Sequence, residues 1–173
     1  MRLPAAIALF LLSSAAHAYD ANGVSLGDKE EDIKKKFPSA RCQPLEWKTR
    51  AADRRCDDGR IAFAGNVEAR ITFYLRHGVI EAFDVRFNGR DLERVGAFLK
   101  KRYGEPLAET RDKIERKDKP SREIYRVRWE KGREHAVLAA EGEKGRPSLL
   151  VSRGDFDSAS APAFAPFPAK LQT

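Results

Sequence analysis

Two neighbouring segments in which apolar and polar residues alternate constrain the fold of this chain more than any other feature. Within residues 69–76 the two sets of positions are Ala69, Ile71, Phe73 and Leu75 against Arg70, Thr72, Tyr74 and Arg76. After a turn at His77-Gly78, residues 79–87 repeat the pattern with Phe83, Val85 and Phe87 against Asp84 and Arg86. A period of two residues is typical of a half-buried strand, so the pattern predicts an antiparallel β-hairpin. One face of this hairpin is expected in the core and the other carries arginines.

Further strands are expected on the same grounds. They run from Arg60 to Gly65, Glu123 to Glu130, Glu134 to Glu141 and Ser148 to Arg153. In the second of these, Tyr125, Val127 and Trp129 alternate with Arg126 and Arg128. The highly charged segment from Lys113 to Arg122 is expected to be a loop, and Asp57-Asp58-Gly59 is expected to be a turn.

Two amphipathic helices are predicted. Asp28 is expected to cap the first, with Glu31 as its capping-box partner, before Pro38 ends the helix. The second is expected to run from about Arg90 to Tyr103 and to end at Gly104. Its apolar stripe consists of Leu92, Val95, Leu99 and Tyr103, with Phe98 beside them.

The order of these elements predicts an α+β fold, an antiparallel sheet with helices packed on one face. Helix, loop and three strands occur twice, which also fits a tandem helix-plus-three-strand repeat. We expect one α+β domain over residues 19–154 and a disordered Ala/Pro-rich tail over residues 155–173. The tail contains three aromatic residues, Phe156, Phe164 and Phe167. The alternative to disorder is that these side chains dock on the sheet of the protein or on a partner.

The first eighteen residues predict a secretory signal peptide. Arg2 is followed by a short apolar run, and Ala16 and Ala18 occupy the positions that a signal peptidase reads. The run is too short to span a bilayer, so no transmembrane segment is expected. We therefore expect cleavage near Ala18 and a periplasmic or secreted protein.

Two cysteines in an exported chain predict one disulfide, between Cys42 and Cys56. The chain-entropy estimate for such a loop is about 3 kcal/mol of stability. A redox pair or a presented binding loop is the functional alternative, but the spacing does not match Cys-x-x-Cys. Trp47 in this loop is a candidate interface anchor, or equally a core plug.

The positive net charge of the chain favours anionic partners but does not identify a particular one. The whole chain has a formal net charge of +7, with both signs mixed throughout. A protein or an anionic glycan or lipid surface fits this excess. Nucleic acid is not expected, because the chain is predicted to be exported and carries no nucleic-acid-binding motif.

Two segments resemble β-lactamase-inhibitor-protein-like domains and the small outer-membrane lipoproteins of the barrel-assembly machinery. They are residues 23–33, with the sequence GVSLGDKEEDI, and residues 100–106, with the sequence KKRYGEP. The resemblance implies a helical pair on an antiparallel sheet, sometimes duplicated, in a protein that binds or scaffolds and is not an enzyme. The chain has no lipidation cysteine, which sets it apart from the lipoproteins.

Catalytic and metal-binding patterns are not recognised. His77 and His135 are the histidines beyond the predicted cleavage point, and neither has a ligand-like spacing to other donors. The carboxylates lie among lysines and arginines, as surface charges do. No catalytic residue, metal site or cofactor is therefore expected.

The outward-facing arginines are the candidate binding surface. It comprises Arg70, Tyr74, Arg76, Arg86, Arg126 and Arg128, and Trp47 is a separate candidate. If the strands share one sheet, these residues form a basic, aromatic-dotted face, since Tyr and Arg are favoured at interfaces. The alternative is an ordinary solvated sheet face, balanced by Asp84 and Glu130.

The leading hypothesis is an exported, non-enzymatic protein that binds or scaffolds another envelope or secreted protein, for example as an inhibitor of a secreted enzyme. The first alternative is a binder of anionic glycan or lipid surfaces through the arginine face. The second alternative is a hydrolase whose site the sequence does not reveal.

Overall fold

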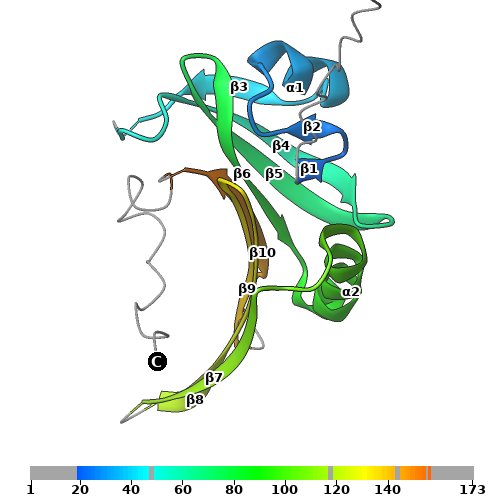
Figure 1. The fold of residues 1–173 in the computed structure, drawn as a ribbon, viewed down its shortest axis with the longest axis vertical. Coiled ribbons are helices and arrows are strands. Elements are labelled where there is room, and N and C mark those ends of the chain that lie inside the picture. The colour runs from blue at the N-terminus through cyan, green and yellow to red at the C-terminus, as the bar shows by residue number, and fades with distance from the viewer. Residues whose placement is uncertain (1–18, 47–48, 117–118, 143–144, 155, 157–173) are drawn as a thin grey trace, which may run out of the picture.

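Most of the chain forms one large antiparallel sheet. The structure is a computed structural model that describes residues 19–46, 49–116, 119–142, 145–154 and 156. Eight strands pair in the order β3-β4-β5-β6-β10-β9-β8-β7 (Figure 1). Their bounds are β3 Arg41–Pro44, β4 Arg54–Phe63, β5 Val67–Arg76, β6 Val79–Phe87, β7 Ala108–Arg116, β8 Lys119–Lys131, β9 Glu134–Glu141 and β10 Ser148–Arg153.

The expected α+β class, with helices packed on one face of the sheet, is wrong. The described helices are α1 (Glu30–Lys36), α2 (Leu92–Tyr103) and the short 3-10 turn η1 (Gly89–Asp91). They are too short to form a layer over eight strands, so the fold is mostly β. The expected repeat of one helix and three strands is also wrong. Each α-helix is followed by four consecutive strands of the large sheet, not three.

The predicted hairpin of residues 69–87 is confirmed by β5 and β6. Alternate side chains of β5 are buried from Val67 to Leu75, and Phe73 faces Phe83 across the strand pair. Phe73 is fully buried, with its ring centroid 5.2 Å from that of Phe37 and 6.0 Å from that of Phe83. The core therefore lies on the side of the sheet defined by this alternation.

The N-terminal residues described contribute to the same core. The hairpin of β1 (Asp20–Ala21) and β2 (Val24–Ser25) pairs only with itself among the described strands. Tyr19, Ala21, Val24 and Leu26 are nevertheless buried in the main apolar cluster. Residues expected to be a simple lead-in thus cover part of the sheet.

Helix α1 is capped differently from the expectation. It begins at Glu30, and the backbone N–H of Lys29 donates to the Asp32 carboxylate at 3.2 Å. Asp28 instead accepts a hydrogen bond from the N–H of Ser25 at 2.8 Å. The predicted Asp28–Glu31 capping box is therefore wrong by one residue at each position.

Helix α2 confirms the second predicted helix and is fixed at its C-terminus by aromatic contacts. Val95 and Leu99 are fully buried, as the apolar stripe requires. Gly104 ends the helix at φ +87°, a conformation that favours glycine. The indole N–H of Trp129 donates to the Gly104 carbonyl at 2.9 Å, and the Tyr103 ring lies 5.8 Å from the Trp129 ring. The helix end is thereby attached to β8.

Two loop assignments fail for the same reason. The charged segment from Lys113 to Arg122 belongs largely to strands, because β7 runs to Arg116 and β8 begins at Lys119. Asp57-Asp58-Gly59 lies inside β4, where the pairing with β5 is interrupted between Asp58 and Ile61. Polar composition indicated loops in both places, but backbone pairing does not require apolar side chains.

Candidate binding surface

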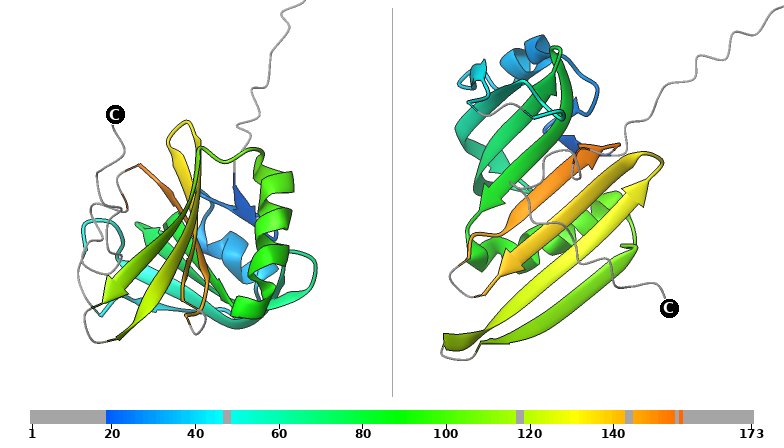
Figure 2. Two further views of the ribbon diagram at one scale, coloured as in Figure 1. Left: turned by 90° about the horizontal axis from the view of Figure 1, so that it is seen from below. Right: turned by 90° about the vertical axis from the view of Figure 1, so that its left-hand side faces the viewer.

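The face of the sheet opposite the main core is the candidate surface, and we call it the outer face. It faces the viewer in the right-hand view of Figure 2, with α2 behind the sheet. Its side chains come from the strand positions that alternate with the core positions. The residue register joins them into rows that cross several strands.

The first row brings together three of the predicted arginines. Crossing from β5 to β7, it consists of Arg70, Arg86, Ser148, Ala139, Arg126 and Thr110. Arg70 and Arg86 are cross-strand neighbours, and both are exposed. The row confirms that these arginines share one sheet and one face.

The second row combines charge with apolar side chains at its centre. Crossing from β4 to β7, it consists of Asp57, Thr72, Asp84, Leu150, Val137, Arg128 and Ala108. Leu150 and Val137 are half-buried neighbours between Asp84 and Arg128. These two residues were not among those expected on the candidate surface, although they alternate along their strands with the apolar residues Leu149, Val151, Ala136 and Leu138.

Part of the outer face is covered by other segments of the chain. Ala51, Ala52, Ala82 and Phe156 form a small buried cluster with Leu45, Tyr74 and Leu150 around it. We call this the outer cluster. The ring centroids of Tyr74 and Phe156 lie 5.6 Å apart. Tyr74 is therefore a packing residue in this state, not a freely exposed anchor.

Asp84 is the buried charge of the outer face. Its side chain is 4% exposed, whereas the Arg86 side chain beside it is 57% exposed, and Arg86 Nε donates to Asp84 Oδ2 at 2.6 Å. Burial raises the pKa of Asp84, although the Arg86 charge acts in the opposite direction. Arg86 therefore compensates a carboxylate that the fold has removed from water.

The same environment suppresses ionisation of Tyr74. Burial raises the pKa of Tyr74 to about 12, and the negative charge of Asp84 adds to this effect. A neutral phenol that packs on Phe156 is thus maintained at any physiological pH.

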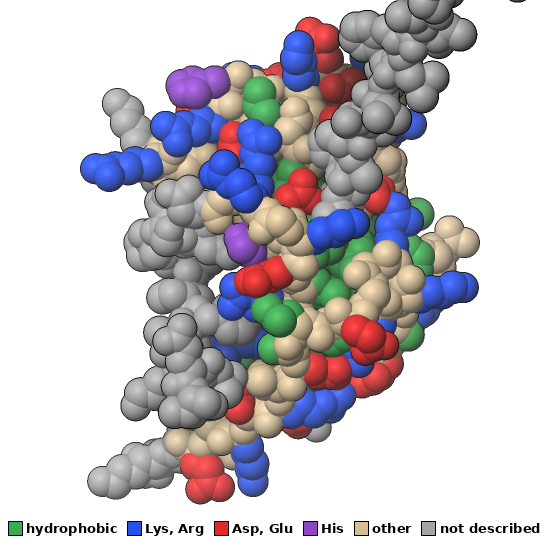
Figure 3. All heavy atoms as spheres, viewed as in Figure 1, with side chains coloured by type: hydrophobic (Ala, Val, Ile, Leu, Met, Phe, Trp, Pro, Cys, Tyr) green, Lys and Arg blue, Asp and Glu red, His purple; other side chains and the backbone are tan. Residues whose placement is uncertain are grey.

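The remaining candidate residues divide into paired and unpaired groups. The Arg128 guanidinium forms an ion pair with Glu130. Arg70 and Arg76 are exposed and make no ion pair with any residue that the structure describes. Trp47 lies outside the described residues. Elsewhere on the surface, Lys and Arg side chains are interspersed with Asp and Glu side chains (Figure 3).

The register also assembles a row of hydrolase-like residue types. Ser152, His135 and Glu130 are successive neighbours on β10, β9 and β8, and His135 Nδ1 lies 3.5 Å from a Glu130 carboxylate oxygen. Serine activation by a histidine base needs a serine that a substrate can reach. Ser152 is only 1% exposed, so the row does not present a nucleophile in this conformation.

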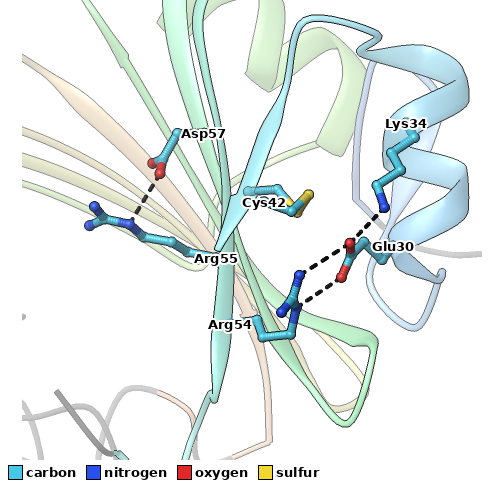
Figure 4. Close-up of a disulfide and its surroundings, with 7 residues drawn as sticks. Glu30, Lys34, Cys42, Arg54, Arg55 and Asp57 are labelled. Atoms are coloured by element: carbon cyan, nitrogen blue, oxygen red, sulfur yellow. Dashed lines mark hydrogen bonds and ion pairs between the residues drawn. A yellow bond between two sulfur atoms is a disulfide. The ribbon is translucent and has the colours of Figure 1, made fainter. Parts of the chain in front are cut away.

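The predicted disulfide is confirmed between Cys42 and Cys56, which face each other on β3 and β4 (Figure 4). Glu30 of α1 lies beside it and binds Lys34 at 2.9 Å and Arg54 at 3.0 Å. Hydrogen bonds from Lys34 and Arg54 lower the pKa of Glu30. The three groups Glu30, Cys42 and Cys56 cluster within 4.8 Å, but disulfide sulfurs are not thiolate ligands. The arrangement is a brace between α1 and two strands.

Comparisons with known proteins add no assignment: neither a family model, nor a curated protein, nor a solved structure matches this chain. The described helices α1 and α2 do not have the length and apolar character of a membrane span.

Proposed function

We propose that this chain is an exported, non-enzymatic protein that binds another envelope or secreted protein through the outer face of its sheet. The observation that carries the proposal is the first row of that face, in which Arg70, Arg86 and Arg126 project from three strands. Three strand-to-strand steps separate Arg86 from Arg126, which corresponds to roughly 14 Å. This spacing suits a protein surface better than a single small ligand.

The composition of the face supports a protein partner. Half-buried Val137 and Leu150 lie between charged residues in the second row, and Leu150 also contacts the outer cluster. An apolar centre with a charged surround is the usual anatomy of a protein–protein interface. An acidic partner surface would complement Arg70, which has no ion-pair partner among the described residues.

The resemblance of residues 23–33 and 100–106 to β-lactamase-inhibitor-protein-like domains supports the same class of function. In its narrower form, the proposal is inhibition of a secreted enzyme. The proposal that the protein is exported rests on the predicted signal peptide and not on the fold.

A second candidate, binding of anionic glycans or lipids, is favoured by one observation. Arg70 and Arg86 are like charges that face each other directly, which is unfavourable in a sheet. Asp84 pairs with Arg86, so among the described residues Arg70 is the member of the pair that an external anion would compensate. Phosphate or carboxylate groups of a glycan or lipid supply such an anion.

One substitution tests the surface that both candidates use, and a second separates them. Immobilised mature protein would be used to capture partners from an envelope extract, and binding of the captured partner would then be measured. Arg70→Glu should weaken binding in either case, and more strongly at low salt. Val137→Lys should weaken binding to a protein, because it places a charge in the apolar centre. The same change should strengthen binding to an anionic glycan or lipid.

The matched control is Lys101→Glu, which reverses an exposed charge on α2, away from the outer face. It should leave binding unchanged, with circular dichroism confirming the fold of all three variants. Equal loss of binding in Lys101→Glu and Arg70→Glu would indicate a net-charge effect and would contradict the proposed surface.

A further inference from the structure

The two edges of the large sheet differ in how they are protected. At one edge, β3 has four residues and ends in Pro44, both of which hinder pairing with another chain. At the other edge, β7 has nine residues and no proline, and it pairs with β8 on one side. The second edge therefore offers a long row of backbone groups.

Exposed apolar side chains mark the same edge. In the described part of the chain, the large apolar residues classed as exposed are Leu107 at 65% and Ile114 at 45%. Leu107 immediately precedes β7, and Ile114 lies near its C-terminal end. These apolar side chains lie at the two ends of the strand whose backbone edge is open.

The direction of the free backbone groups follows from the strand ladder. The Glu123 carbonyl accepts from the N–H of Gly142, which directs Glu123 toward β9. Backbone groups alternate in direction along a strand, so the next residue, Ile124, is directed toward its β7 partner Asp112. On β7 the same alternation leaves the N–H and C=O groups of Glu109, Arg111 and Lys113 at the open edge.

We propose that β7 pairs with β7 of a second copy of this chain, antiparallel, about a two-fold axis at Arg111. A two-fold axis perpendicular to the sheet keeps each residue on its own face. It then places Glu109 opposite Lys113, Ala108 opposite Ile114, and Thr110 opposite Asp112. Each pairing occurs twice, so the charges of Glu109 and Lys113 are matched, whereas Leu107 lies opposite Glu115.

Neighbouring registers differ in the charges that they place opposite each other. An axis at Asp112 places this aspartate opposite its own copy and Glu109 opposite Glu115. An axis at Lys113 places two lysines opposite each other and Asp112 opposite Ile114. Like charges directly opposite destabilise a strand pair, which disfavours these two registers. An axis at Thr110 places Glu109 opposite Arg111 and pairs no like charges, so complementarity limits the dimer to the registers at Thr110 and Arg111.

The arginine on the axis is already compensated within its own chain. Its guanidinium lies 3.3 Å from Glu93 and 3.7 Å from Glu123. It also stacks over the Tyr125 ring, 4.6 Å from the centroid. The approach of two Arg111 side chains therefore brings together two neutralised groups. This dimer goes beyond the proposed function and does not depend on the outer face having a partner.

Sedimentation velocity of the mature protein over a range of concentrations tests the proposal. We expect a reversible monomer–dimer equilibrium. Lys113→Pro should weaken the dimer by at least about tenfold, because it removes an edge-directed N–H from each copy without removing a bond to β8. Lys113→Ala is the matched control and should keep most of the affinity, since the backbone donor remains.

A second measurement identifies the edge directly. Residue-resolved hydrogen exchange should show the amides of Glu109, Arg111 and Lys113 becoming protected as concentration rises. Ile114→Lys should reduce this protection, and thermal melting should confirm that each variant is folded. A protein that remains monomeric at all concentrations, or a dimer that Lys113→Pro and Ile114→Lys leave intact, would overturn the proposal.

Discussion

Arg70 and Arg86 lie directly opposite each other on β5 and β6, and only Arg86 has a carboxylate partner among the described residues. Two like charges in one cross-strand pair are unfavourable, whereas opposite charges in the same place are favourable. Arg86 therefore compensates a buried carboxylate in the folded protein, whereas Arg70 adds only repulsion to the cross-strand pair.

The first prediction therefore concerns Arg70. Arg70→Glu should increase the free energy of unfolding by up to about 0.5 kcal/mol at low salt, because it converts a repulsive cross-strand pair into an attractive one. Urea unfolding measures the change, and the gain should shrink as salt is added. Arg76→Glu, at the end of the same strand, is the control and should show a smaller change. Destabilisation by Arg70→Glu would mean that the side chain has a folding role that the structure does not reveal.

The second prediction concerns Arg86 and the buried charge beside it. Arg86→Gln should destabilise the protein by about 2 kcal/mol near neutral pH, because it leaves Asp84 buried without compensation. This figure is below the usual cost of breaking a buried pair, since the Arg86 side chain is half-exposed.

The pH dependence of this effect follows from the Asp84 pKa. Burial raises that pKa in the folded state, and loss of the Arg86 charge should raise it further. Below the unfolded-state pKa the carboxyl is protonated in both states, so the two proteins should converge in stability. Their difference should grow as pH rises through the folded-state pKa. The double variant Asp84→Asn with Arg86→Gln should recover most of the loss, and no recovery would contradict the charge explanation.

The third prediction concerns the disulfide. Replacing both Cys42 and Cys56 by serine should lower the free energy of unfolding by about 3 kcal/mol, as expected for a loop of this length. The loss should be seen in denaturant unfolding under oxidising conditions. With a strong reductant present, wild type and variant should unfold alike. Equal stability under oxidising conditions would exclude the structural role.

Local alternation made the central hairpin predictable from sequence. In β5 alternate positions are buried, so apolar residues recur at every second position. In β6 the outer-face residues Ala82 and Asp84 are buried as well, but Phe83, Val85 and Phe87 keep the same period. The hairpin of β7 and β8 lacks this signal at its outer end, where Asp112, Lys113 and Glu115 are all exposed. Backbone pairing determines the structure there, and residue composition does not report it.

The sequence predicted which arginines lie on the candidate surface, but it did not predict how they align across the strands. The positions of Arg70 and Arg126 on one face follow from alternation within their own strands. Their alignment in one row depends on the pairing of β6 with β10, which joins segments that are distant in sequence. For Phe156, docking on the sheet was the sequence-based alternative to a disordered tail, and the structure shows it, but Tyr74 as the contact could not be predicted from local pattern.

The final prediction concerns Phe156. Phe156→Ala should destabilise the protein by about 3 kcal/mol, as truncation of a buried aromatic residue does, because Phe156 is 4% exposed in the outer cluster. It should also lower the pKa of Tyr74 from about 12 toward the ordinary value of 10.0, since burial is the main cause of the shift. Ultraviolet absorbance of tyrosinate measures this, with Tyr74→Phe identifying the Tyr74 signal.

The same shift determines how stability changes with alkaline pH. The unfolded chain ionises Tyr74 near 10.0 and the folded chain near 12, so stability should fall across that interval. The fall should be smaller in Phe156→Ala, where the two pKa values lie closer together. Phe98→Ala is the matched control, since Phe98 is a half-buried aromatic residue whose ring lies 6.2 Å from that of Phe63. It should reduce stability without moving the Tyr74 titration, and an unchanged Tyr74 pKa in Phe156→Ala would show that Phe156 does not shield this face.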